Sequence, residues 1–266
     1  MAKNTFRTSP PEEQNTIKAE SFLSRLKNFG SSDEHQSLSQ IIVRYILKFF
    51  MYFFSITIVW VFVLKFLPIW FTPTMIDRKI TAISEGRDSE IHSDWEPYEN
   101  ISKEAALAVV ASEDQLFPQH FGFDFAAMWG AFKHNLKGKK IKGASTISQQ
   151  VAKNVFLWQG RSYVRKFLEV YFTFLIEVIW GKERILEVYL NVAEMGKMTF
   201  GVEAASLRYY GHSAKLLNRA EAARIAAVLP SPIRFSIANP SKYVQKRTNA
   251  IMKQMRRLGG KAYLKF

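Results

Sequence analysis

The helical character of this chain is clearest in residues 162–180, which read SYVRKFLEVYFTFLIEVIW. Apolar residues recur there at the three- and four-residue spacing of an amphipathic helix. The run also carries Arg165, Lys166, Glu169 and Glu177, which are too many charges to cross lipid at low cost. We therefore predict a helix that packs on a core or lies against a membrane, and not one that spans it.

Helical patterns continue on both sides of this run. AALAVVAS precedes Glu113 and FDFAAMWGAF follows Gly122, and further helices are predicted at 182–194, 202–210, 219–229 and 241–258. The sequence contains no alternating strand series, internal repeat, phosphate-binding glycine loop or metal-type His/Cys spacing. The predicted fold class is mainly α.

A membrane segment is predicted near the N-terminus. Residues 49–64, FFMYFFSITIVWVFVL, carry no charge, and the apolar run continues past Lys65 to residue 71. With Lys48 and Lys65 snorkelling, a helix of about 20 residues crosses a bilayer. A buried core helix or a cleaved signal peptide is the alternative, but the long polar stretch before the run is unlike a signal's n-region. The positive flanks are balanced, so they leave the orientation open.

The chain is therefore divided into four parts. We predict a mobile tail at 1–43, a transmembrane anchor at 44–71, a connector at 72–100 and one globular domain at 101–266. A total of 37 Lys and Arg against 23 Asp and Glu gives a net charge of +14, which favours an anionic partner: nucleic acid, a phospholipid surface or a phosphorylated substrate. The absence of cysteine excludes disulfides and thiolate chemistry.

The first chemically suggestive cluster follows the helix that ends at Glu113. It runs from Glu113 and Asp114 through His120 to Asp124. A carboxylate at the end of an apolar helix is partly desolvated, and desolvation raises a carboxyl pKa toward the value that suits a general base. A solvated acidic helix end is the bland alternative, and His120 either hydrogen-bonds a carboxylate or packs.

The second cluster combines small, hydroxyl, amide and cationic residues. It reads GASTISQQVAKN at 143–154, and its polar candidates are Ser145, Gln149, Gln150 and Lys153. Such donors and acceptors suit a polyhydroxylated or phosphorylated ligand. The alternative is an ordinary helix N-terminus that Ser145 or Thr146 caps.

The third and fourth clusters lie on the helices that follow. Arg161, Arg165 and Glu169 share one helical stripe at four-residue spacing, either as a surface ion-pair ladder or as the lining of a groove. In the fourth cluster, KERILEVYLN at 182–191, Tyr189 is predicted to pack in the core. We expect this last cluster to support the fold and not to carry chemistry.

Taken together and in this order, the four clusters resemble the family 51 glycosyltransferases. The patterns EDxxFxxHxGxD, GxSTIxQQxxKN, RxxxRKxxE and KxxILExYLN are present without a broken position. The resemblance covers residues 101–252 and implies a lysozyme-like, two-lobed, mainly helical domain with a smaller membrane-apposed lobe and a cleft. It also implies a peptidoglycan glycosyltransferase that polymerises lipid II with inversion at C1 and release of undecaprenyl diphosphate.

The resemblance also assigns roles to residues. Glu113 would be the general base, and Glu169 the second essential carboxylate, near the donor diphosphate, where it would position a divalent ion or basic groups. Lys153, Arg161 and Arg165 would bind the diphosphate. Substrate-orienting candidates are Asp114, Ser145, Gln149 and Gln150. Mg²⁺ or Mn²⁺ is expected as an activator, with Glu169 as the candidate ligand.

Partners and location follow from the same resemblance. The expected partners are lipid II, the growing lipid-linked glycan, the membrane and other cell-wall synthases, and not nucleic acid. The chain would be a single-pass protein of the bacterial cytoplasmic membrane, with its N-terminus in the cytoplasm and its catalytic domain periplasmic or extracytoplasmic. No KTG triad is present and the early SxxK lies in the predicted tail, which indicates a member without transpeptidase activity.

Two other functions are compatible with these clusters. A lytic muramidase is also helical and uses paired carboxylates on a related polysaccharide, although it needs no basic stripe for a diphosphate. A non-catalytic scaffold for cell-wall synthesis would keep the fold without the chemistry. The intact acidic motifs favour an enzyme.

Overall fold

A computed structural model describes residues 38–138, 143–160 and 162–266. The chain divides into two units, with the boundary between Ile56 and Thr57. Most of the predicted tail, 1–43, lies outside the described residues. The described part of the first unit belongs to helix α2 (Leu38–Leu64), whose last two turns belong to the second unit.

Helix α2 contains the predicted membrane segment. Among the described residues it is the one helix long and apolar enough to cross a membrane, judged by length and composition. The helix begins before the uncharged run and ends at Leu64, so the stretch FLPIWF beyond Lys65 is not part of it. Pro68 in that stretch disfavours a helical conformation for the residue before it.

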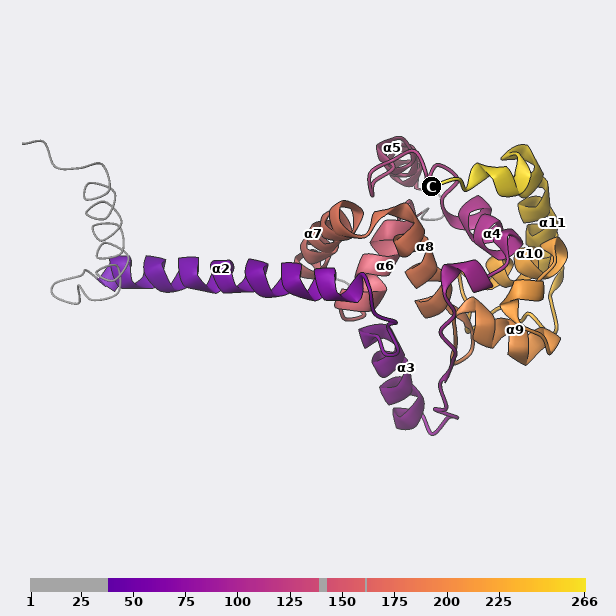
Figure 1. Cartoon of the computed structure of the whole chain (residues 1–266), viewed down its shortest axis with the longest axis horizontal. Coiled ribbons are helices and arrows are strands. Elements are labelled where there is room, and N and C mark those ends of the chain that lie inside the picture. The colour runs from indigo at the N-terminus through magenta and orange to yellow at the C-terminus, as the bar shows by residue number, and fades with distance from the viewer. Residues whose placement is uncertain (1–37, 139–142, 161) are drawn as a thin grey trace, which may run out of the picture. The chain divides into compact units, whose positions relative to one another are not determined.

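The second unit is mainly helical, as predicted (Figure 1). Its elements after α2 are α3 (Pro73–Ser84), β1 (His92–Ser93), η1 (Tyr98–Asn100), α4 (Lys103–Glu113), α5 (Phe125–Leu136), α6 (Ile147–Phe156), α7 (Tyr163–Ile179), α8 (Gly181–Val192), β2 (Glu194–Gly196), β3 (Thr199–Phe200), α9 (Val202–Tyr210), η2 (Ala214–Leu216), α10 (Arg219–Val228), α11 (Lys242–Arg257) and η3 (Gly260–Tyr263).

Most of these helices start at a side chain that accepts a backbone N–H of the first turn. The capping residues include Thr72, Ser102, Asp124, Thr146, Ser162, Asn218 and Ser241. Such caps satisfy N–H groups that have no partner inside the helix. The polar residues that interrupt the apolar periodicity therefore set where the helices begin.

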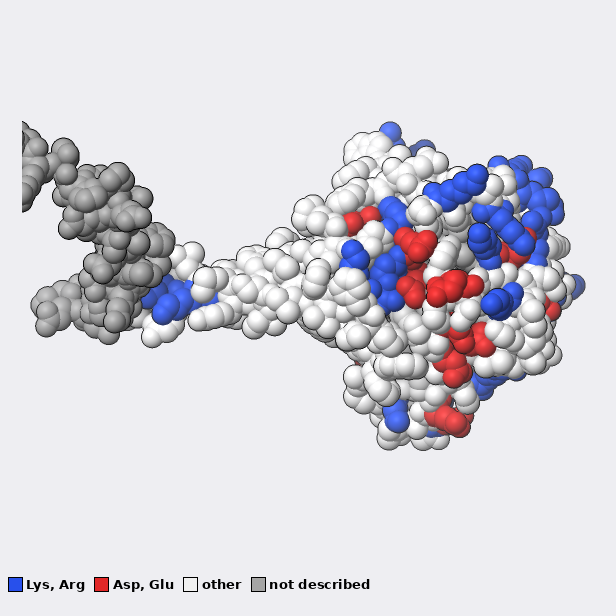
Figure 2. Space-filling view, in the orientation of Figure 1, with Lys and Arg blue, Asp and Glu red and all other residues white. Residues whose placement is uncertain are grey.

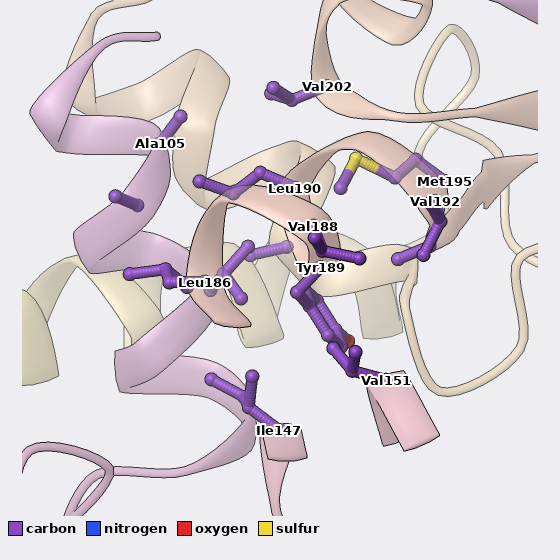
Figure 3. Packing of buried hydrophobic residues seen from close by; sticks show 14 of the residues in the cluster. Ala105, Ile147, Val151, Leu186, Val188, Tyr189, Leu190, Val192, Met195 and Val202 are labelled. Carbon is purple, nitrogen blue, oxygen red and sulfur yellow. The ribbon is translucent and has the colours of Figure 1, made fainter. Parts of the chain in front are cut away.

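The helices of the second unit pack in two groups. Helix α4 packs against α10 and α11, and α6 packs against α7 and α8. One buried apolar cluster joins the groups, with Leu107 from α4, Ile147 from α6 and Leu186 from α8 fully buried. Figure 3 shows side chains of α8 lying among those of α4 and α6. The two polar clusters at the ends of α4 and α6 are thereby carried on one core.

A small sheet departs from the sequence prediction. Strand β3 pairs in parallel with β1 and antiparallel with β2. The helix predicted at 182–194 ends at Val192, and Glu194 belongs to β2. Strands of two or three residues are too short to show an alternating pattern, so the sequence carried no signal for them.

The end of α2 is tied to the second group of helices. The indole N–H of Trp180 donates to the carbonyl oxygen of Val61 at 2.7 Å, and Arg184 Nη2 donates to the carbonyl oxygen of Leu64 at 2.8 Å. Arg184 also donates to the carbonyl oxygen of Leu67 and pairs with Glu187 at 2.8 Å. The carbonyl groups of Val61 and Leu64 belong to the last turn of α2, where carbonyls have no intrahelical partner, and Leu67 lies three residues beyond it.

Candidate active site

The carboxylate of Glu113 lies at the last residue of α4. The helix is almost wholly buried along its length, but the Glu113 side chain remains 14 % exposed. Its Oε1 accepts a hydrogen bond from Ser112 Oγ at 2.9 Å and lies 3.3 Å from Arg247 Nη2, and its Oε2 accepts from Gln150 Nε2 at 3.2 Å. Glu113 is thus an acid held by α4, α6 and α11 with part of its surface still open.

The neighbouring Asp114 has a different set of partners. It is 6 % exposed, and its two oxygens lie 2.9 and 3.1 Å from His120 Nε2. Its Oδ2 also accepts the backbone N–H of Ile147 at 3.0 Å, at the start of α6. His120 therefore hydrogen-bonds a carboxylate, one of the two alternatives left open by the sequence, and Asp114 links the loop after α4 to the N-terminus of α6.

The N-terminus of α6 is built as a capping box. Thr146 Oγ1 accepts the backbone N–H of Gln149 at 3.2 Å, and Gln149 Oε1 accepts the backbone N–H of Thr146 at 3.0 Å. Gln149 is only 2 % exposed, whereas Ser145 is exposed just before the helix. Of the two capping candidates, Thr146 is the cap.

The loop between Asp114 and α5 lies close against α6 and α7. Thr146 Oγ1 donates to the carbonyl oxygen of Gly122 at 2.6 Å. Gly122 has a φ of +77°, and a Cβ there would lie 2.8 Å from Thr173 Cγ2. Both the backbone conformation and the space require glycine at this position.

Next to that contact, a buried ion pair joins three helices. Glu177 Oε1 accepts from Ser148 Oγ at 2.5 Å and from Lys182 Nζ at 2.7 Å. Lys182 Nζ also lies 4.5 Å from the centre of the Phe117 ring. The pair connects α6, α7 and α8 behind the loop that carries His120.

The second carboxylate, Glu169, lies on α7 and is 3 % exposed. Arg165 Nη1 donates to its Oε2 at 2.7 Å, and Lys166 Nζ donates to its Oε1 at 2.5 Å. Arg165 and Glu169 therefore form an ion pair, but the carboxylate is buried and does not form the surface ladder that was one of the two alternatives. Arg161 lies outside the described residues.

Lys153 on α6 completes a group of three cations around Glu169, which we call the cationic cluster (Lys153, Arg165 and Lys166). Burial lowers the pKa of Lys153, and the Glu169 charge opposes that shift. The positive charges of Arg165, Arg78 and Lys166 lower the pKa further. No hydrogen bond or ion pair of the Lys153 ammonium is found within the described residues. An amine in this setting favours an added anion.

The sequence did not single out Arg78 or Arg247. Arg78 Nε on α3 donates to Glu194 Oε2 at 2.9 Å, and burial raises the pKa of Glu194 while Arg78 lowers it. Arg247 Nη2 on α11 donates to Ser112 Oγ at 2.9 Å, besides its approach to Glu113. In the sequence, Arg78 stands among the positive residues that follow the predicted anchor, and Arg247 falls within the helix predicted at 241–258. Nothing local to either residue indicated a partner more than 100 positions away.

Helix α6 joins the surroundings of the two acids. Gln150 bonds Glu113, and Lys153, whose pKa the Glu169 charge affects, follows three residues later. Residues at this spacing lie on one face of a helix. One face of α6 therefore connects the two acids. Gln150 on this face contacts Glu113, and Lys153 on the same face lies near Arg165 and Glu169 of α7.

A protein-built metal site is not evident around Glu169. Within the described ranges, no group of three or more His, Cys, Asp or Glu side chains is placed to hold a metal ion. Both oxygens of Glu169 accept hydrogen bonds from cations instead. The donors present do not fit a divalent-cation cage made by the protein alone.

Comparison with known proteins identifies the class. Residues 78–256 match the family model described as Transglycosylase, and the chain belongs to this family. A biosynthetic peptidoglycan transglycosylase from Pseudomonas putida strain F1 is 49 % identical over 223 residues, which cover 84 % of this chain and 94 % of the relative. The chain is accordingly an enzyme, a peptidoglycan glycosyltransferase that polymerises glycan strands, as the motifs predicted.

Relatives from a second genus and from another Pseudomonas species give the same result. The biosynthetic peptidoglycan transglycosylase of Chromohalobacter salexigens is 47 % identical over 222 residues, with 84 % of this chain and 95 % of the relative covered. The protein of that description from Pseudomonas syringae pv. tomato is 46 % identical over 225 residues, with 85 % and 95 % covered. The match spans nearly the full length of these relatives.

Proposed function

We propose that this enzyme polymerises lipid II, a disaccharide linked to a polyprenyl diphosphate, and does not cross-link the product. The 4-hydroxyl of the acceptor sugar attacks C1 of the lipid-linked donor chain and gives up its proton. The new bond forms on the face opposite the leaving group, so the α linkage becomes β. The C1–oxygen bond breaks with its electron pair going to undecaprenyl diphosphate.

Glu113 is the proposed proton acceptor. Its carboxylate is partly exposed, and its described contacts leave an oxygen lone pair for the acceptor hydroxyl. Placing a base at the end of a buried helix limits how far it moves, which favours proton transfer in a fixed geometry. This placement beside the cationic cluster, along one face of α6, is the single observation that carries the proposal.

The cationic cluster is proposed to hold the donor diphosphate. Negative charge grows on the leaving diphosphate as its bond to C1 breaks, and fixed cations stabilise that charge without moving. Lys153 is available for the diphosphate because no protein anion binds its ammonium directly among the described residues. Arg165 offers a planar fork suited to phosphate oxygens, and Arg161 is proposed for the same group.

Glu169 is proposed to hold these cations in place. Three positive groups near one another repel, and a buried carboxylate between Arg165 and Lys166 offsets that repulsion. Asp114, Ser145, Gln149 and Gln150 are proposed to orient substrate or the groups that touch it. A divalent cation remains a proposal, with Glu169 as the candidate ligand.

The proposed location is the outer face of the bacterial cytoplasmic membrane. Helix α2 would span the membrane with its N-terminus inside, and the domain would work outside, where wall strands are made. Exposed apolar side chains along one face of α7 support a membrane-facing surface: Tyr163, Val164, Phe167, Val170, Phe174 and Val178. In Figure 2 the visible surface over α7 is largely uncharged, whereas Lys and Arg gather over α11 and η3.

The decisive experiment supplies lipid II to the full chain in detergent or vesicles. Glycan polymer and free undecaprenyl diphosphate are expected, and digestion of the polymer should yield no cross-linked peptides. A lytic muramidase would shorten preformed strands and make no polymer from lipid II, which would reject the proposal. A scaffold would do neither.

The same assay tests the divalent cation. Turnover is measured after chelation and after Mg²⁺ or Mn²⁺ is restored. Loss and recovery of turnover would support an activating cation, and equal turnover in both conditions would reject it. Other cell-wall synthases are proposed partners, to be tested by adding a purified synthase to the assay and measuring the rate of strand growth.

A further inference from the structure

The two oxygens of the Glu113 carboxylate are not equivalent. Oε1 accepts a hydrogen bond from Ser112 Oγ at 2.9 Å and another from Arg247 Nη2 at 3.3 Å. Oε2 receives Gln150 Nε2 at 3.2 Å, and no second donor to it is found in the described part of the chain. A carboxylate oxygen has two lone pairs, so Oε2 keeps one for a further donor.

Gln150 can serve Oε2 only in one orientation. A carboxamide presents N–H donors at one end and a carbonyl acceptor at the other, and the two ends have nearly the same shape. If the amide turned over, its carbonyl oxygen would face the Glu113 carboxylate and repel it. The orientation of Gln150 therefore decides whether Glu113 is held or displaced.

Tyr189 on α8 holds the amide in that orientation from the other side, together with the acceptor-only carboxylate of Glu113. Its hydroxyl donates to Gln150 Oε1 at 3.1 Å, which leaves the amide nitrogen for Glu113. Tyr189 is 1 % exposed and lies among apolar side chains, with its hydroxyl end directed toward α6 (Figure 3). The contact thus joins the core to the base through one amide.

The Tyr189 hydroxyl stays protonated and can therefore keep donating its hydrogen bond. Burial raises the pKa of Tyr189 well above its ordinary value, and the negative charges of Glu113 and Asp114 raise it further. The phenol keeps its proton throughout the pH range in which such an enzyme works. A buried hydroxyl without a hydrogen-bond partner costs free energy, and the partner of this one is the amide that also holds the base.

We propose that Tyr189 is a positioning residue that fixes Gln150, so that Gln150 holds Glu113 with Oε2 turned toward the acceptor hydroxyl. Oε2 is then the atom that takes the proton. This inference rests on the proposed role of Glu113 as the base. Tyr189 itself touches neither sugar nor diphosphate.

The test is a double-mutant cycle in the full chain, with kcat and KM for lipid II and the unfolding temperature as readouts. Tyr189→Phe removes only the hydroxyl and is expected to lower kcat about tenfold with KM unchanged, since a displaced base loses part of its contribution. Gln150→Ala is expected to lower kcat at least as much. In the Gln150→Ala background, Tyr189→Phe should add nothing, because the two residues act through one contact.

A matched control separates positioning from stability. Tyr171 Oη lies 2.7 Å from Thr57 Oγ1, so Tyr171→Phe also removes a tyrosine hydroxyl from a hydrogen bond, but away from Glu113. This control should leave kcat unchanged. A normal kcat in Tyr189→Phe, or a loss matched by Tyr171→Phe, would overturn the proposal.

Two further outcomes are distinguishable. If the effects of Tyr189→Phe and Gln150→Ala multiply, Tyr189 does not act through Gln150 and the positioning role is rejected, even if Glu113 is the base. If Glu113→Gln keeps near wild-type turnover, the base assignment itself fails. Non-additive losses together with an inactive Glu113→Gln support both.

Discussion

Glu113 and Glu169 are two largely buried carboxylates with opposite surroundings. The Glu113 side chain, 14 % exposed, meets a hydroxyl, an amide and one arginine at 3.3 Å. The Glu169 side chain, 5 % exposed, has one cation on each oxygen, at 2.7 and 2.5 Å. The first carboxylate keeps capacity to accept a proton, and the second is committed as a counter-charge. One residue type therefore serves two purposes, which the neighbours decide.

The largest expected effect comes from removing the acid at the first position. Glu113→Gln keeps the shape of the side chain and an oxygen that can face Arg247, but the amide cannot take a proton. We therefore expect kcat to fall by about 10²- to 10⁴-fold. Lipid II turnover and the unfolding temperature are measured together. Glu99→Gln on η1 is the matched control, because Glu99 is exposed and, in the part of the chain that the structure describes, forms no hydrogen bond or ion pair with Glu113 or Glu169. Near wild-type turnover in a folded Glu113→Gln protein would remove the distinction between the two acids.

The second expected effect is the loss of the counter-charge. Glu169→Gln leaves Arg165 and Lys166 without their counter-charge and replaces one of the two acceptor oxygens by a donor. We therefore expect kcat/KM for lipid II to fall about 100-fold, in the range seen when a preorganised electrostatic group is lost. The affinity for a diphosphate-containing substrate analogue should also fall. A protein with a lower unfolding temperature and unchanged turnover per folded molecule would show that Glu169 serves only the fold.

The third test separates one cation from the others. Lys153→Ala should raise KM for lipid II by about 10- to 100-fold, which corresponds to a charge-assisted hydrogen bond of about 1.5–3 kcal/mol. Lys253→Ala, an exposed lysine on α11, is the control and should change nothing. An unaltered KM in Lys153→Ala would exclude Lys153 from diphosphate binding.

A pH titration sharpens this third test. Because burial lowers the pKa of Lys153, its charge is lost at a lower pH than that of an ordinary lysine, and KM should rise on the alkaline side earlier than expected for a free lysine. An arginine stays charged there, so Lys153→Arg should move this rise to higher pH. If the alkaline rise stays in place in Lys153→Arg, another group causes it.

The smallest effect concerns the surfaces beside the two acids. The chain has no cysteine, so single cysteines can be labelled cleanly. A polarity-sensitive dye at Phe167→Cys, on the apolar face of α7, should report a dry setting in vesicles, and one at Lys253→Cys on α11 a wet setting. Turnover should stay within about twofold, because exposed substitutions change little. Equal emission at both positions would contradict the membrane-facing role of α7.

Much of the helical framework was predictable from the sequence. The helix at 202–210 was predicted with the bounds found for α9. Helix α10 ends one residue earlier than predicted, and α11 is one residue shorter than predicted at each end. Apolar periodicity and polar caps are local features, and both are visible in the sequence. The two- and three-residue strands carried no such signal.

The site was predictable only in its parts. Motif spacing indicated Glu113, Lys153, Arg165 and Glu169, but the partners of Glu113 come from α6 and α11 and depend on packing. Tyr189 shows the limit well. It is buried as expected for a core residue, yet its hydroxyl meets Gln150, 39 positions earlier, and no helical period relates the two.

The bonds from Trp180 and Arg184 to the end of α2 bear on how a water-soluble version of the enzyme should be made. A truncation that removes all of α2 would leave Trp180 and Arg184 without the carbonyl acceptors of Val61 and Leu64. It would also expose the apolar surface of Phe156 that packs against Trp60. A truncation just before Thr57 would instead keep the last two turns of α2, and with them both hydrogen bonds and the Trp60 contact. The apolar helix α2, which requires detergent, and the catalytic unit therefore share residues. The boundary between the two units lies inside α2.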